Sequence, residues 1–173
     1  MCAAFSTWQY LNRSKSKAKE AIARAFAAAC VHMRFVAEMY HEQLEGNRYF
    51  LHEHPRYATS WELDCMVTLQ KCYGVDTVRG DQCQYGAVAS SGPEKGQPVK
   101  KPTGFMSNSV EILHALSRIC SGRNGQCGRP DGGRHAQCSG QTAKDAAKHP
   151  RDLCRAVLRG LTAQLRKDGR IVN

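Results

Sequence analysis

A long segment with one apolar stripe, from about residue 16 to residue 45, is the feature that most constrains the fold. Its apolar side chains recur every three or four residues: Ile22, Phe26, Ala29, Met33, Val36, Tyr40 and Leu44. This spacing predicts an amphipathic α-helix with one buried face. Gly46-Asn47 offers a helix end, and residues 49–52 follow as a short apolar strand. Because a helix, a tight turn and a strand in this order form half of a crossover unit, we expect an α/β fold with a small, mostly parallel sheet flanked by helices.

The rest of the chain adds further predicted elements to this unit. A capping-box pattern at residues 59–62 predicts a helix that ends at Gly74, and residues 75–78, 82–85 and 105–106 are predicted strands. A second cap predicts a helix from residue 108, and Pro150 suits the first position of a last helix that ends at Gly169. We expect one domain over residues 16–168 with mobile loops at 86–103 and 121–141. A disordered basic segment (1–15) would precede it, and a short tail (169–173) would follow.

Composition limits the partners of this domain. The longest apolar run, residues 25–31, is far shorter than the roughly 20 residues that a membrane helix needs, so we expect no membrane partner. The 25 basic residues exceed the 15 acidic ones and give a net charge of +10. Such a charge favours acidic partners, namely DNA or RNA, anionic lipid or acidic protein, although a solvated basic surface would have the same composition.

The nine cysteines bear on the compartment. Their number is odd and they contain no CxxC pair, which favours reduced thiols in an intracellular protein of the nucleus or cytoplasm. Residues 1–19 contain no acidic residue and several Ser, Lys and Arg residues, which is also typical of a mitochondrial presequence.

A glycine-rich segment holds a candidate metal site. Residues 121–140 contain six glycines and almost no apolar side chains, so this segment cannot build a core. Cys120, Cys127, His135 and Cys138 have the spacing C-x6-C-x7-H-x2-C. Four such ligands suit tetrahedral zinc, which would order the loop. The first gap is longer than that of the usual zinc knuckle, so the alternative is a flexible loop with unrelated thiols.

Two groups of basic residues are candidates for binding phosphate. Lys100 and Lys101 precede the predicted helix start at residue 108, where a helix N-terminus would favour an anion. On the last helix, Arg151, Arg155 and Arg159 lie on the side away from the predicted apolar face. Both groups would also be explained as solvated surface charge.

A polar pattern at the end of the first strand is the candidate for catalysis. Glu53 and His54 close this strand, where the carboxyl ends of the strands of an open α/β sheet line a ligand crevice. Glu53 would serve there as an acid, a hydrogen-bonding anchor or a metal ligand. Side chains alternate along a strand, so His52 and His54 point to one face and Glu53 to the other, which argues against one shared ion. A solvated strand end is the alternative.

Several short motifs, taken in order, resemble a segment of copia-type retrotransposon polyproteins. More remotely, they resemble the C-terminal half of phage-type cytosine-5 DNA methyltransferases, over about residues 32–160. The motifs are YFLHEHP at 49–55, SW at 60–61, DQCQYG at 81–86, KPT at 101–103, SNS at 107–109 and HPxxLC at 149–154.

This resemblance implies a partial Rossmann-like, methyltransferase-like architecture. It also implies a role for Glu53, because the glutamate of the first methyltransferase motif hydrogen-bonds the flipped cytosine and helps to protonate its ring. His54 stands where that family has asparagine. The family's nucleophilic cysteine and its glycine-rich turn for S-adenosylmethionine have no counterpart in this chain, so that cofactor would bind only in a longer precursor.

Three functions are consistent with these residues. The first is a non-catalytic or decayed fragment of a retroelement polyprotein, with neighbouring polyprotein domains, that associates with nucleic acid. The second is a methyltransferase-like or nuclease-like enzyme that is completed by a partner or a longer precursor. The third is a protein-interaction module without a ligand. Zinc is the one cofactor that the residues of this chain suggest.

Overall fold

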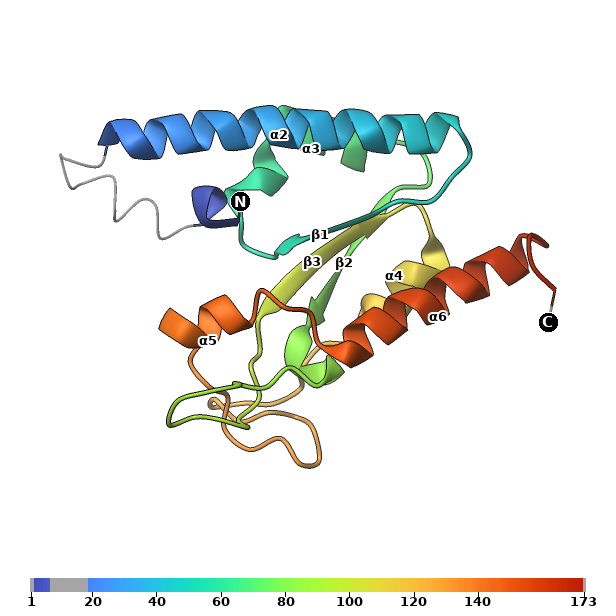
Figure 1. Ribbon diagram of the computed structural model, residues 1–173. Coiled ribbons are helices and arrows are strands. Elements are labelled where there is room, and N and C mark those ends of the chain that lie inside the picture. The colour runs from blue at the N-terminus through green and yellow to red at the C-terminus, as the bar shows by residue number, and fades with distance from the viewer. Residues whose placement is uncertain (1, 7–18, 173) are drawn as a thin grey trace.

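The computed structural model describes residues 2–6 and 19–172 of the chain (Figure 1). The expected disordered segment 1–15 lies largely outside these residues, although Phe5 is described and is fully buried. No helix among the described residues is long and apolar enough to cross a membrane. The elements are η1 (Cys2–Phe5), α2 (Lys19–Glu45), β1 (Leu51–Pro55), η3 (Thr59–Glu62), α3 (Asp64–Gln70), β2 (Asp76–Asp81), η4 (Gln82–Tyr85), β3 (Pro102–Ser107), α4 (Val110–Leu116), α5 (Gly140–Asp145) and α6 (Arg151–Lys167).

The sheet is antiparallel, so the expectation of a mostly parallel, partial Rossmann-like sheet is wrong. Its strand order is β1-β3-β2, and β3 pairs antiparallel with both neighbours. Phe105 of β3 lies opposite Glu53 of β1 on one side and Val78 of β2 on the other. β1 and β2 therefore run in the same direction, as a helical crossover requires, but β3 lies between them in the opposite direction. Each pair of neighbouring strands in this sheet is antiparallel as a result.

Helices cover both faces of this sheet (Figure 1). Consecutive side chains of a strand point to opposite faces, and Phe105 and Met106 of β3 accordingly enter different cores. Met106 packs in a cluster with Met33 of α2 and Leu69 of α3. On the other face, Phe105 packs in a cluster with residues of α4 and α6, of which Leu116 is fully buried.

A third region lies at the end of the sheet farthest from α2 (Figure 1). We call it the cysteine lobe and define it as residues 82–101 and 118–139. Tyr85 of this region packs in the Phe105 cluster, and the separate buried apolar cluster of the lobe consists of three small side chains, Ala89, Val99 and Ala136. Isolated β-bridges, Val88 with Pro98 and Gln126 with Arg134, fold its two loops back on themselves. Residues 82–85, expected as a strand, form the 3-10 helix η4 instead.

Candidate functional site

Three cysteines and one histidine converge in the cysteine lobe. Cys83 comes from η4, Cys120 follows α4, and Cys127 and His135 come from the two arms of the bridged loop. Their ligand atoms all lie within 4.8 Å of one another; Cys83 and Cys120 are buried, and Cys127 and His135 are partly buried. This buried Cys3His group could hold a metal ion.

Two distances within the group agree with a tetrahedral zinc site. The Sγ atoms of Cys120 and Cys127 are 3.9 Å apart, and Cys120 Sγ lies 3.6 Å from His135 Nε2. In a tetrahedral site with zinc at its usual distances from its ligands, two sulfur atoms are about 3.8 Å apart, and a sulfur and a nitrogen atom are about 3.6 Å apart. The donor types and these two separations therefore fit zinc.

Backbone and side-chain N–H groups point at the sulfur atoms. The N–H of Gly128 donates to Cys120 Sγ at 3.3 Å. The side-chain amide of Gln84 donates to Cys83 Sγ at 3.5 Å and to Cys127 Sγ at 3.7 Å. Donors in these positions stabilise thiolates, which are the form of cysteine that binds metal.

The glycines of this segment are required by its tight turns. A Cβ atom at Gly122 would overlap the carbonyl oxygen of Gln126, and one at Gly128 would overlap the hydroxyl of Ser121. The arms of the loop are joined by hydrogen bonds from Cys127 N–H to the Gly133 carbonyl at 2.8 Å and from His135 N–H to the Gly125 carbonyl at 2.7 Å. The glycine-rich composition that prevents a core here thus permits a close wrap around the sulfur atoms.

A buried carboxylate attaches the group to the sheet. Asp81, the last residue of β2, is fully buried and accepts a hydrogen bond from the backbone N–H of Cys120 at 2.9 Å. The guanidinium of Arg79 donates to both carboxylate oxygens at 3.0 and 3.1 Å, and Lys100 Nζ lies 3.9 Å from one of them. The carboxylate is therefore compensated, as a buried charge must be, and it fixes the position of the Cys120 backbone.

The protonation equilibria of Cys120 and His135 favour a bound cation, whereas that of Cys83 opposes it. Burial raises the pKa of Cys83 to about 12, so its thiol would lose its proton at neutral pH only beside a positive ion. Burial also raises the pKa of Cys120, but N–H donors from Gly128 and Gly122 outweigh it and the net shift is downward. Burial, followed by the nearby Lys100, lowers the pKa of His135 and keeps its ring neutral, as a ligand must be.

The structure corrects the ligand set expected from the sequence in one position. It brings together Cys120, Cys127 and His135, but the fourth member is Cys83, and Cys138 is exposed outside the group. The chain leaves the group after His135, because Ala136 N–H pairs with the Pro98 carbonyl and Ala136 is buried in the small apolar cluster. Cys83 was missed because it lies 37 residues before Cys120, outside the range of any knuckle spacing. The glycine-rich loop cannot build a core, and its first cysteine gap is too long for a usual zinc knuckle. These two features were the sequence signal that a ligand from elsewhere in the chain completes the group.

Glu53 and His54, the candidates for catalysis, lie on opposite faces of the sheet. Glu53 Oε1 is buried without a hydrogen-bond partner, 3.9 Å from Lys101 Nζ, and Oε2 is 3.9 Å from His149 Nε2. His54 is buried on the face of α2, where its Nδ1 lies 2.5 Å from Ser60 Oγ. Burial, together with the charge of Lys101, lowers the pKa of His54 to about 4. The two residues therefore do not form one site, and the neighbours of Glu53 are Lys101 and His149.

The basic candidates fall into two different environments. Lys100 lies beside Asp81, and Lys101 lies beside Glu53 and donates to the Ala146 carbonyl at 2.9 Å. In contrast, Arg151, Arg155 and Arg159 are exposed on α6. With about 100° of rotation per residue, these three arginines lie within roughly 80° of the helix circumference. They form one stripe, in which Arg155 pairs with Asp152 at 3.2 Å.

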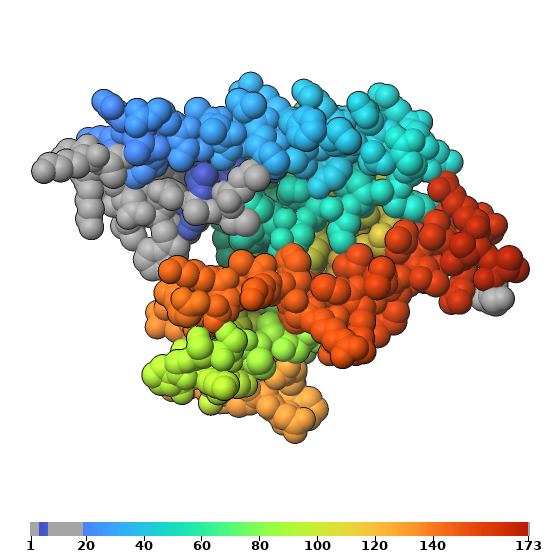
Figure 2. All heavy atoms as spheres, viewed as in Figure 1, coloured from blue at the N-terminus to red at the C-terminus, as the bar shows by residue number. Residues whose placement is uncertain are grey.

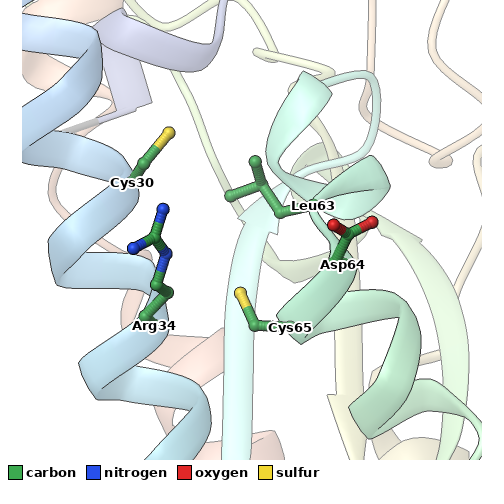
Figure 3. Close-up of a pocket in the computed structure, with 5 residues that line it drawn as sticks. All are labelled: Cys30, Arg34, Leu63, Asp64 and Cys65. Carbon is green, nitrogen blue, oxygen red and sulfur yellow. The ribbon is translucent and has the colours of Figure 1, made fainter.

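A small cleft lies between α2 and the start of α3, on the side of the sheet opposite the Phe105 core. Its volume is about 280 Å³, and Cys30, Arg34, Leu63, Asp64 and Cys65 line it (Figure 3). The side chains of the two elements face one another across the cleft (Figure 3). Ligand sites normally occupy about 300–1,000 Å³, so the volume of this cleft is just below that range.

Comparison with known proteins identifies no relative: no protein-family model, curated protein or solved structure matches the chain significantly.

Proposed function

We propose that this protein is a zinc-stabilised, non-catalytic module that binds nucleic acid, of the kind that a retroelement polyprotein would carry. The observation that supports this proposal most is the Cys3His group, whose ligand atoms lie within 4.8 Å of one another in a lobe with almost no apolar core. When bound, zinc would supply the stability that apolar burial does not supply there. Cys83, Cys120, Cys127 and His135 would hold it.

Charge supports nucleic acid as the partner. The net charge is +10, and the exposed arginine stripe of α6 offers guanidinium groups that suit phosphate geometry. The loop that carries Cys120, Cys127 and His135 adds Arg118, Arg123, Arg129 and Arg134, against one acidic residue, Asp131. Lys100 and Lys101 contribute less, because nearby carboxylates partly neutralise them.

Binding to labelled DNA and RNA duplexes and single strands, measured over a range of salt concentrations, tests this function. We expect affinity to fall steeply with salt, because each phosphate that the protein neutralises adds about 0.9 to the slope of log K against log salt. The double variant Arg155→Ala/Arg159→Ala should weaken binding and reduce this slope by roughly 2. Arg34→Ala/Arg56→Ala removes two exposed arginines elsewhere and is the matched control. Binding that is absent, or that does not respond to salt, would refute the proposal.

A second candidate function is an acid–base enzyme that is completed by a partner or a longer precursor. Glu53 favours it, because a buried carboxylate oxygen without a hydrogen bond is costly unless something else uses it. Lys101 beside it has a φ of 29°, which non-glycine residues adopt at a cost of order 1–3 kcal/mol. Methyl transfer to DNA from labelled S-adenosylmethionine by a longer precursor, abolished by Glu53→Gln, would support this candidate. A precursor that incorporates no label would exclude the methyltransferase.

A further inference from the structure

Helix α2 carries a second apolar stripe in addition to the one that packs on the sheet. Val31, Phe35 and Met39 are exposed to 63%, 56% and 39%. Large exposed apolar side chains are common singly, but three that follow one another at intervals of four residues form a continuous ridge. Ala28, also exposed, extends this ridge by one turn toward the N-terminal end of α2.

The ridge lies on the side of α2 that faces away from the protein. With about 100° per residue, Ala28, Val31, Phe35 and Met39 lie within roughly 80° of one another. The buried residues Met33 and Ala37 lie on the other side of the helix, at least about 120° away. In Figures 1 and 2, α2 forms one edge of the molecule along its whole length. The ridge is therefore accessible to another molecule.

The charged residues beside the ridge are arranged so that they could pair with the same residues of a second copy. Arg24 and Glu42 are both exposed and share the angular position of the ridge, to within roughly 20° of its centre. They are equally distant from Met33 in sequence, nine residues before and nine after. Val31 and Phe35 are also equally distant from Met33, two residues before and two after. A two-fold axis at the level of Met33 would thus place Val31 against Phe35 and Arg24 against Glu42.

We propose that a second copy of this chain docks on the ridge, with the two α2 helices antiparallel. Each copy then contributes the same surface, as a two-fold interface requires. Val31 and Phe35 of one copy pack against Phe35 and Val31 of the other, and two Arg24–Glu42 pairs flank them. A parallel arrangement would instead place Arg24 near Arg24 and Glu42 near Glu42. The repeated opposite charges therefore favour the antiparallel dimer over the parallel one.

The dimer should be weak, since its apolar part is three or four side chains on each copy and the rest is exposed charge. Interfaces of this size belong to transient complexes, and we expect a dissociation constant on the order of 10–100 µM. The Arg24–Glu20 pair within one helix does not oppose docking, because its partners are exposed and 3.7 Å apart and such pairs contribute little.

Sedimentation equilibrium of the full chain, with zinc present and no nucleic acid, tests the proposal. The wild type should show a monomer–dimer equilibrium. Phe35→Glu should weaken dimerisation at least about tenfold, because it places a charge against the apolar Val31 of the other copy and two like charges on either side of the two-fold axis. Val110→Glu, which alters an exposed apolar residue on α4, is the matched control and should leave dimerisation unchanged.

Charge reversal tests the antiparallel arrangement. Arg24→Glu alone and Glu42→Arg alone should each weaken dimerisation roughly fivefold, since each change affects two symmetric pairs. The double variant Arg24→Glu/Glu42→Arg should restore it. All these residues are exposed, so circular dichroism should confirm that each variant folds as the wild type does.

A wild-type protein that stays monomeric up to millimolar concentration overturns the proposal. A dimer that Phe35→Glu does not affect also overturns it, as does one that the double reversal fails to restore. If another part of the same chain covers the ridge, or if the ridge binds a different protein, the experiments give one of these contradicting results. Loss of nucleic-acid binding would refute the proposed function but would leave the dimer unaffected.

Discussion

The sheet and the cysteine lobe are stabilised in two different ways. The sheet lies between two apolar clusters that contain large, fully buried side chains such as Leu69, Met106 and Leu116. Apart from Tyr85, which packs in the Phe105 cluster, the buried apolar cluster of the cysteine lobe consists of Ala89, Val99 and Ala136. Burial of a large side chain contributes roughly 1.5–3 kcal/mol, and alanine contributes far less. The sheet can therefore be stable through burial, whereas apolar burial contributes much less to the lobe, whose Cys3His group could hold a metal ion.

This difference implies that the two regions should respond to different perturbations. Changes to the metal ligands should affect the lobe and leave the sheet folded. Changes to the apolar clusters should lower the stability of the sheet by the same amount with or without zinc.

The largest effect is expected from removal of the metal ligands. The full chain should hold about one zinc ion, and Cys127→Ser or a strong chelator should remove it. Because the lobe would then lack its main source of order, trypsin should cleave after Arg123 and Arg134 at least about ten times faster. Metal analysis and timed proteolysis measure the two effects, and far-ultraviolet circular dichroism should report a sheet that remains folded.

Cys138→Ser is the control for this experiment, because Cys138 is exposed and outside the Cys3His group. It should leave both the zinc content and the cleavage rate unchanged. Loss of zinc in Cys138→Ser but not in a Cys83→Ser variant would show that the ligand set expected from the sequence, and not the observed group, binds the metal.

The next effect concerns the apolar cluster under α4 and α6. Phe105→Ala should lower the free energy of unfolding of the sheet by about 3–5 kcal/mol, because Phe105 is 1% exposed and its removal leaves a cavity. Urea titration followed by circular dichroism should give the same decrease with zinc and with chelator. Val110→Ala, at an exposed site, should change stability by less than about 0.5 kcal/mol. A decrease that occurs only in the presence of zinc would mean that the two regions do not unfold separately.

The smallest effect concerns pH. Burial, followed by the nearby His54, lowers the pKa of His52 to about 4 in the folded protein, while the unfolded chain takes up the proton near pH 6.5. The unfolded state therefore binds more protons between these values, and stability falls as the pH is lowered from 6.5 toward 4. Between pH 6.5 and 5 the contribution of His52 is about 2 kcal/mol.

Urea titrations of the chelated protein at pH 6.5 and pH 5 measure this decrease without interference from the metal ligands. His52→Gln should reduce the pH dependence by the contribution of His52. An unchanged dependence in His52→Gln would assign it to other groups, His54 first among them.

Helices α2, α4 and α6 could be predicted from sequence because each carries its own signal, whereas α5 was not expected and the helix expected over 59–74 is divided into η3 and α3. The apolar repeat of α2, the cap pattern at residues 108–111 and the apolar spacing of α6 are local patterns. In the structure the cap of α4 is Ser109, whose Oγ accepts the Ile112 N–H. Strand direction carries no such signal. The pattern that predicted a crossover fits the like-directed strands β1 and β2, but it contains nothing about β3, which separates them.

The candidate site shows the same division. Cys120, Cys127 and His135 lie within 16 residues and could be found from their spacing. Cys83 joins them only because the end of β2 lies beside the segment that follows α4. Asp81, the last residue of β2, holds this arrangement by accepting a hydrogen bond from the Cys120 N–H. The neighbours of Glu53 likewise depend on β1 lying beside residue 101 and the segment that precedes α6.

The central position of β3 has a consequence for how the chain acquires its structure during synthesis. β1 and β2 make their ladder bonds with β3 and not with each other. While the ribosome is still adding residues before Pro102, both early strands are exposed at their edges and have no partner. A nascent chain that stalls at that stage should be prone to aggregation, and release of β3 completes both ladders at once.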